Sequence, residues 1–173
     1  SSFKKLLQSQ EVDITRITET HLKSSVKMRI RNLWCTGTKE NKCYGRGITI
    51  LVKSTVPHRP ALTSGLNVLE VTAIFICLNN VETLIVSAYH SPQGNINDRD
   101  LTAFISKHQN FIICGNINTK HWIWNSRINT PRGDQLLEHA ARWQYAVLGP
   151  QDPTRYSWIA SQDGSREPRP TEL

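Results

Sequence analysis

Two consecutive β-rich runs constrain the fold of this chain more than any other part of its sequence. Residues 69–78 (LEVTAIFICL) and 81–88 (VETLIVSA) are rich in apolar and β-branched side chains, and only Asn79 and Asn80 separate them. Asn is a common turn former that tolerates left-handed backbone, and a two-residue connection between such runs is typical of a β-hairpin. The sequence therefore predicts an antiparallel hairpin over these residues.

A third apolar run leads directly into a cluster of polar residues. Residues 111–114 are hydrophobic and Gly115 closes them, which predicts a short strand buried on both faces and ending at a turn. In α/β folds, ligands bind beyond the carboxyl ends of such strands. The cluster is therefore either a binding site or, more simply, an Asn-rich turn. Its amide, ammonium and imidazole groups belong to Asn116, Asn118, Lys120 and His121.

Covering helices and further strands follow from the spacing of the other apolar residues. Helical spacing predicts helices at 98–107 and 134–145, and alternation predicts a strand at 12–17. A strand pattern resumes at 46–52, whereas residues 21–45 carry many charges with little periodicity and are expected to form a variable loop. The inner face of the second helix is expected to contain Leu136, Leu137, Ala140, Ala141 and Trp143.

Length and composition predict one intracellular domain with a basic surface. A chain of 173 residues is long enough for one domain with its own core. The formal net charge of +7 suits a polyanionic partner such as nucleic acid, although a basic surface is often only a solvated one. No apolar run approaches membrane-spanning length and the first residues lack a signal-peptide core, so a reducing compartment is expected. Cys77 and Cys114 are accordingly expected to be buried thiols.

The polar cluster and three other segments resemble motifs of one family, the endonuclease domain of jockey-like non-LTR retrotransposons. Residues 115–126 (GNINTKHWIWNS) are similar to the family's G-D-F-N-A-K-H-x-x-W-x-S, with Asn116 in place of its aspartate. TETHL at 18–22, GRGITILVK at 45–53 and AYHSP at 88–92 are similar to further family segments, in the same order along the chain. The family is an apurinic/apyrimidinic-endonuclease-like branch of the endonuclease/exonuclease/phosphatase superfamily.

The resemblance implies an α/β fold, a two-sheet α/β sandwich flanked by helices, of the DNase I-like type. Residues 1–173 would form a single partial endonuclease/exonuclease/phosphatase domain, truncated at both ends. The family's first strand, and its last strand with a histidine, have no counterpart in the sequence. Helical spacing of Phe3, Leu6 and Leu7 agrees with a chain that opens within a helix.

The resemblance also implies roles for individual residues. Glu19 would ligate the catalytic Mg²⁺, with Mn²⁺ as an alternative, and a carboxylate is a ligand that Mg²⁺ prefers beside water and substrate phosphate. Tyr89 and Asn118 would hold the scissile phosphate. Asn116 stands where the family's aspartate activates the attacking water, and an amide supplies neither its negative charge nor its proton acceptance. Further substrate-binding residues would be Lys120, His121 and Asn125.

Simpler structural interpretations stay open for several of these residues. Outside the family context, Glu19 is an exposed loop residue, and Tyr89 is a strand-end ring packed on the core. Trp122 and Trp124 could stack on bases or deoxyribose. Aromatic residues beside a buried strand more often belong to the core, and Trp124 is expected to pack.

The implied activity is Mg²⁺-dependent nicking of one strand of target DNA in the nucleus. The nick frees a 3′-hydroxyl from which a linked reverse transcriptase primes. The expected partners are therefore DNA and a reverse transcriptase domain of the parent polyprotein, with no membrane, and Asn116 predicts an impaired activity. One alternative is a catalytically inactive nucleic-acid-binding remnant. The other is a phosphoesterase of the same superfamily acting on a small substrate, against which the K-H-x-x-W segment argues.

Overall fold

The structure of the chain is a computed structural model, and its elements fall into two compact units, Ser1–Asn118 and Thr119–Leu173. The prediction of a single domain over 1–173 stays a prediction. At residues 35–37, 104, 156–160 and 166–170 the backbone alone is described. In all, the structure describes residues 12–18, 33–37, 47–63, 66, 68–93, 96, 98–149, 156–160 and 166–170.

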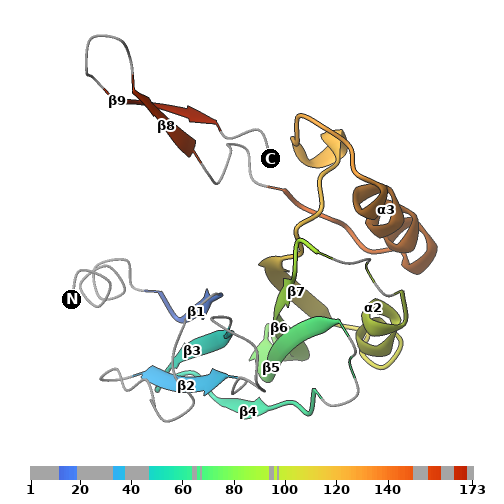
Figure 1. Ribbon diagram of the computed structural model, residues 1–173. Helices are drawn as coiled ribbons and strands as arrows, with labels where there is room; N and C mark the ends of the chain where they lie inside the picture. Colours follow the sequence, from blue (N-terminus) through green and yellow to red (C-terminus); the bar gives the residue numbers. More distant parts are fainter. Residues whose placement is uncertain are drawn as a thin grey trace. The chain divides into compact units, whose positions relative to one another are not determined.

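The predicted hairpin is confirmed and forms the centre of the first unit (Figure 1). Strand β5 (Leu69–Leu78) pairs antiparallel with β6 (Val81–His90). Asn79 and Asn80 have φ angles of 49° and 63°, which is the pair of positive values that a type I′ turn requires. The predicted burial of Cys77 is wrong, because the residues of β5 next to this turn are exposed.

A four-stranded sheet is built around this hairpin, in the order β4-β5-β6-β7. Strand β4 (His58–Pro60) pairs antiparallel with β5, and β7 (Phe111–Asn116) pairs parallel with β6. The prediction that the apolar run of β7 is buried on both faces is wrong, since the Ile112 side chain is 46% exposed. The physical reason is its place in the sheet, because β7 is the end strand in this order and pairs with β6.

The first unit contains a second sheet of three strands in the order β1-β3-β2. Strand β3 (Thr49–Lys53) lies between β1 (Ile14–Ile17) and β2 (Leu33–Gly37), and both pairings are antiparallel. The prediction of a loop throughout 21–45 is wrong at β2. Nothing in LWCTG alternates like a strand, and it is the pairing with β3 that makes this segment extended.

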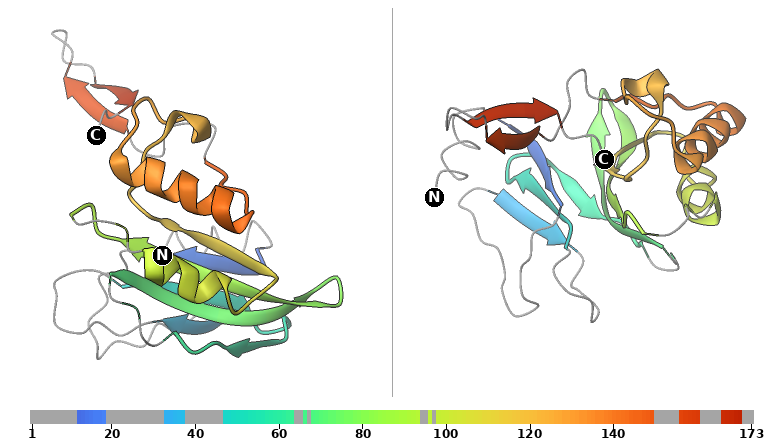
Figure 2. Two further views of the ribbon diagram at one scale, coloured as in Figure 1. Left: turned by 90° about the vertical axis from the view of Figure 1, so that its right-hand side faces the viewer. Right: turned by 45° about the horizontal axis from the view of Figure 1, so that its top comes forward.

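The core of the first unit lies between its two sheets. Ile50 and Val52 of β3 form one buried cluster with Ile74 and Ile76 of β5, so the sheets pack face to face (Figure 2). Full burial of one such side chain stabilises a fold by about 1.5–3 kcal/mol. The two-sheet α/β sandwich predicted above is therefore present in the described residues.

The predicted helix at 98–107 is confirmed as α2 (Asp98–Ile105), which connects β6 to the parallel β7. Its Asp100 is buried, and its carboxylate oxygen Oδ2 accepts hydrogen bonds from the backbone N–H groups of Val68 (2.8 Å) and Leu69 (3.1 Å). These bonds satisfy the buried charge and tie the helix to the start of β5.

The second unit contains the short 3₁₀ helix η1 (Trp122–Trp124), the helix α3 (Pro131–Trp143) and a hairpin of β8 (Tyr156–Ala160) with β9 (Arg166–Pro170). The helix predicted at 134–145 is present, but it begins three residues earlier.

The early start of α3 has a local cause. Thr130 caps the helix with its side-chain oxygen and Pro131 occupies the first turn, both of which favour a helix N-terminus. The predicted inner face is right at Leu136 and Ala140 but wrong at Ala141, which is exposed, and His139 is buried instead. Neither α2 nor α3 is long and apolar enough to cross a membrane.

Candidate active site

Three side chains form a row across the four-stranded sheet of the first unit, at the carboxyl ends of β6 and β7. Tyr89 of β6 is the register partner of Asn116 in parallel β7 and of Glu70 in antiparallel β5. Directly paired residues of neighbouring strands lie on the same face of a sheet. This polar row, Glu70, Tyr89 and Asn116, therefore combines a carboxylate, a phenol and an amide at one edge, where ligands of α/β folds bind.

A glycine brings the two parallel strands of the row together. A Cβ atom at Gly115 would lie 2.1 Å from the carbonyl oxygen of Ala88, which is backbone and cannot rotate away. Ala88 and Gly115 are register partners, one position before Tyr89 and Asn116. The glycine that closes the apolar run is therefore required for the spacing of the row.

Asn116 and Asn118 form a tight turn where β7 ends. The side-chain oxygen Oδ1 of Asn116 accepts a hydrogen bond from the backbone N–H of Asn118 at 3.1 Å. Asn118 has a left-handed φ of 51°, and its amide nitrogen Nδ2 donates to the carbonyl oxygen of His90 at 2.6 Å. The Asn-rich turn and the candidate site are thus the same structure, which fixes the Asn118 amide beside the end of β6.

This turn explains how residue 116 can be an asparagine without loss of local structure. The hydrogen bond uses a side-chain oxygen, which aspartate and asparagine both possess. The substitution relative to the family motif therefore keeps the turn and removes only the negative charge. Asn118 matches the family motif and Asn116 departs from it, and the catalytic roles of both stay predictions.

Tyr89 is the middle residue of the row and is buried, with 4% of its surface exposed. This burial agrees with the simpler interpretation, in which the Tyr89 ring packs on the core. Its register beside Asn116 still places the residue at the edge where the polar row forms. A role in holding phosphate stays a prediction.

Glu70 is the member of the row that the sequence analysis missed. The hairpin itself carried a usable signal, because every pair of facing residues from Leu69↔His90 to Leu78↔Val81 has numbers that sum to 159. Residue 70 must then face residue 89. Glu70 is partly buried and has polar or electrostatic contacts of its own.

The predicted metal ligand, Glu19, lies outside the described residues. Among the residues that are described, no three His, Cys, Asp or Glu side chains come together in a group that could hold a metal ion. Glu70 does supply the polar row with one carboxylate, the kind of ligand that Mg²⁺ prefers. The described residues of the row thus offer one carboxylate, and a metal site stays a prediction.

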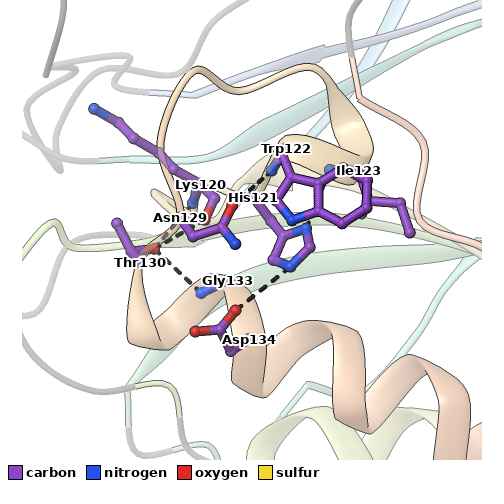
Figure 3. A network of polar contacts seen from close by, with 8 residues as sticks. All are labelled: Lys120, His121, Trp122, Ile123, Asn129, Thr130, Gly133 and Asp134. Carbon is purple, nitrogen blue, oxygen red and sulfur yellow. Dashed lines mark hydrogen bonds and ion pairs between the residues drawn. The ribbon is translucent and has the colours of Figure 1, made fainter.

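Lys120 and Thr130 join the two ends of a loop in the second unit (Figure 3). The Lys120 backbone N–H donates to the Thr130 hydroxyl oxygen Oγ1 at 3.1 Å, and the Thr130 N–H donates to the Lys120 carbonyl at 2.9 Å. The same hydroxyl oxygen accepts from the Gly133 N–H at 3.2 Å. One side chain thus caps α3 and closes the loop that carries the K-H-x-x-W residues.

His121 lies inside this loop, with 4% of its surface exposed. Its ring nitrogen Nδ1 accepts from the Ile123 N–H at 3.1 Å, so Nε2, 3.4 Å from the Asp134 oxygen Oδ1, carries the hydrogen of the neutral ring. The ring also stacks on Trp122 and contacts the Trp124 ring. His121 therefore supports the loop, and substrate binding by His121 and Lys120 stays a prediction.

The two tryptophans of η1 have opposite environments. Trp124 is 8% exposed, which confirms the expectation that it packs, whereas Trp122 is 66% exposed. Asn125, predicted to bind substrate, has a left-handed φ of 65°, and its backbone N–H closes η1 by donating to the Trp122 carbonyl at 3.0 Å. Its side chain is exposed, and the substrate-binding role is untested.

Comparison with known proteins relates the chain to retrotransposon polyproteins. The family model described as "Endonuclease-reverse transcriptase" matches residues 83–165. The probable RNA-directed DNA polymerase from transposon BS of Drosophila melanogaster is 25% identical over 162 residues, which are 91% of this chain and 18% of that protein. The polymerase from mobile element jockey of the same species is 27% identical over 155 residues, covering 88% of the chain and 17% of that protein.

Solved structures show the same fold. The endonuclease domain of TRAS1, a telomere-specific non-LTR retrotransposon, superposes with a TM-score of 0.74 at 18% identity, over 95% of this chain and 73% of that one. D. rerio TDP2 complexed with single strand DNA product gives a TM-score of 0.53 at 11% identity, over 98% of this chain and 72% of that one.

The fold is a two-sheet α/β sandwich like that of the TRAS1 endonuclease domain, as predicted. More narrowly, the family model, the transposon polymerases and the TRAS1 structure together support a non-LTR retrotransposon endonuclease domain, the family that the sequence motifs had indicated. The chain spans less than a fifth of the two curated relatives named above.

Proposed function

We propose that this endonuclease domain nicks one strand of DNA by hydrolysing a phosphodiester bond, with reduced efficiency. Water attacks phosphorus, the bond from phosphorus to the 3′ oxygen breaks, and the 3′-hydroxyl so formed primes a reverse transcriptase of the same polyprotein. The observation that carries the proposal is the polar row together with the Asn118 turn, at the carboxyl ends of parallel β6 and β7.

The roles follow from the chemistry of each group. The Asn118 amide is held in place by its bond to the His90 carbonyl, and with Tyr89 it would orient the scissile phosphate. Such positioning supplies much of the catalysis in phosphate chemistry. Mg²⁺ or Mn²⁺, held by Glu19, would stabilise negative charge on the phosphoryl oxygens. Asn116 holds the turn but cannot accept a proton from water, which is the reason for the reduced efficiency.

Binding of the DNA backbone is proposed to depend on the basic surface. The net charge of +7 favours contact with phosphates and release of their counterions. Lys120, His121 and Asn125 are the proposed substrate-binding residues, His121 by supporting the loop from within. The family activity would place the protein in the nucleus.

One alternative has a specific observation in its favour. An inactive nucleic-acid-binding remnant would keep the basic surface and the turn while losing the carboxylate, which is the state of residue 116. A phosphoesterase for small substrates is disfavoured, because Lys120, His121 and Trp124 match the retrotransposon motif in order.

Nicking of supercoiled plasmid in Mg²⁺ distinguishes these functions. General acid–base groups contribute about 10²- to 10⁴-fold in rate, so the unmodified chain is expected to nick at or near background while binding DNA at low salt. Asn116→Asp keeps the turn and restores the charge. An increase in its nicking would identify residue 116 as limiting, whereas background nicking with intact binding would favour the inactive remnant.

Two further variants serve as controls for this assay. Glu19→Ala removes the proposed metal ligand and should abolish any Mg²⁺-dependent nicking. Glu82→Ala is the matched control, because Glu82 is an exposed carboxylate paired with Arg59 away from the polar row. Robust nicking by the unmodified chain that Glu19→Ala abolishes would refute the proposed impairment, and failure to bind DNA at low salt would refute the proposed function itself.

A further inference from the structure

The second unit exposes an aromatic residue, Trp122, whose ring also stacks on the buried His121. Trp122 is largely exposed, and its neighbour Ile123 is half exposed, while Trp124 on the same turn of η1 is buried. An exposed apolar side chain forgoes the stabilisation that burial gives. The two residues form a small apolar projection, the Trp122–Ile123 ridge, whose exposure is not needed for the packing below it.

Hydrogen bonds hold this ridge in one conformation (Figure 3). The Trp122 N–H donates to the Asn129 side-chain oxygen Oδ1 at 2.9 Å, and the Ile123 N–H donates to His121 Nδ1 at 3.1 Å. The indole ring stacks on the imidazole of His121, with ring centres 5.4 Å apart and planes at 28°. Because the ridge is already ordered, little further conformational entropy is lost when a ligand binds to it.

The charges of the surrounding segment select the kind of ligand. Residues 119–133 contain Lys120, Arg127 and Arg132, and the first acidic residue that follows, Asp134, lies 3.4 Å from His121, so cationic residues outnumber the single carboxylate here. An exposed aromatic ring within a cationic segment is the combination that proteins use to stack on the bases of single-stranded nucleic acid while contacting its phosphates. A protein partner with an acidic surface would match the charges but has no need of an ordered π-face.

We propose that Trp122 is a stacking platform for an unpaired base of DNA, with Ile123 as its apolar support. This rests on the proposed function, because it specifies the form of DNA that the nicking domain recognises. A base must leave the duplex to stack on the ring, so the chain prefers single-stranded or locally opened DNA to intact duplex. The cationic residues contribute to both forms, and the ring contributes only where a base is available.

The test measures binding of fluorescently labelled single-stranded and duplex oligonucleotides by anisotropy, at about 50 mM and about 200 mM salt. Trp122→Ala is expected to weaken single-strand binding by about 5- to 150-fold, the range for loss of one stacking aromatic. Duplex binding should change by less than about threefold, and the salt dependence should not change, because no charge is removed.

Three variants keep the test decisive. Trp122→Phe retains a π-face and should bind nearly as well as the unmodified chain, whereas Trp122→Leu retains apolar bulk without it and should behave like Trp122→Ala. Leu148→Ala is the matched control, because Leu148 is an almost fully exposed apolar residue of the same unit. Far-UV circular dichroism of each variant verifies that the chain is folded.

The outcomes separate this inference from the proposed function. If the unmodified chain binds neither form of DNA, the proposed function fails and the stacking platform fails with it. If the unmodified chain binds DNA and Trp122→Leu binds the single strand equally well, the platform is refuted while the nicking function stands. Loss of single-strand binding in Trp122→Leu but not in Trp122→Phe supports the platform.

Discussion

Replacement of Gly133 by alanine should destabilise the protein, although the usual effect of this change in a helix has the opposite sign. Gly133 lies in the first turn of α3, where alanine is preferred to glycine by up to about 1 kcal/mol. A Cβ atom at this position would, however, lie 2.0 Å from the Lys120 carbonyl oxygen and 3.2 Å from the His121 Cβ. The first of these is a backbone atom, so no change of rotamer relieves the clash.

The size of the effect follows from the two opposing terms. Overpacking of a well-packed site costs about 1–3 kcal/mol, and the upper end applies where the obstacle is backbone. Subtraction of the helix preference leaves a loss of about 2 kcal/mol in the free energy of unfolding. For a chain of this size, that loss lowers the melting temperature by about 4–8 °C.

Thermal melting followed by far-UV circular dichroism measures this loss. Gln135→Ala is the matched control, because Gln135 is exposed on the same helix and its replacement should change stability by less than about 0.5 kcal/mol. Binding of DNA should also weaken for Gly133→Ala, since the displaced carbonyl belongs to the loop of Lys120. A Gly133→Ala chain that melts at or above the temperature of the parent would refute the steric reasoning.

Three further predictions concern the loop closed by Thr130 and the polar row with its Asn118 turn. Thr130→Ala should cost about 2 kcal/mol in urea unfolding, near the upper limit for a cap, because the lost hydroxyl serves Gly133 and the loop together; a cost below about 0.5 kcal/mol would contradict this. Asn118→Ala should be less stable than Asn118→Gly by about 1 kcal/mol, since alanine is strained at its left-handed φ, and equal stabilities would argue against the turn. Glu70→Gln should tighten DNA binding about two- to fivefold in EDTA, because it removes a negative charge from the polar row; weaker binding would exclude Glu70 from the DNA surface.

The parts of the fold that sequence predicted well are those whose cause is local. The β5–β6 hairpin is specified by the two Asn residues of its turn, and α2 by the spacing of its apolar residues. Strand β2 was missed because its extended form comes from pairing with β3, a partner that no pattern within LWCTG reveals. The exposure of Ile112 was missed for a related reason, since the place of β7 at the end of the sheet is a property of topology.

Some residues of the candidate site were predicted from the sequence, and others were missed. Asn116 and Asn118 were found because they follow a buried run and match a motif, and the structure joins them in one turn. Glu70 was missed because its significance depends on strand register and not on its neighbours in sequence. His121 was predicted to bind substrate, which stays a prediction, and its burial against two tryptophans was missed because no pattern in the sequence reveals it.

The mixed directions of the strands have a consequence for the order in which the molecule folds. The β5–β6 hairpin closes between adjacent segments, an event that takes about 1–10 μs. The β6–β7 pairing joins Leu84 to Phe111, with the whole of α2 between them in the sequence. Such long-range parallel contacts form late, because the chain loses conformational entropy in closing the intervening segment before the contacts stabilise it. We therefore expect the strand that bears Asn116 to be added to a hairpin that already exists, so that substitutions at Asn79 or Asn80 change the folding rate while Gly115→Ala mainly speeds unfolding. A newly made chain would then form the β5–β6 hairpin before the polar row is complete.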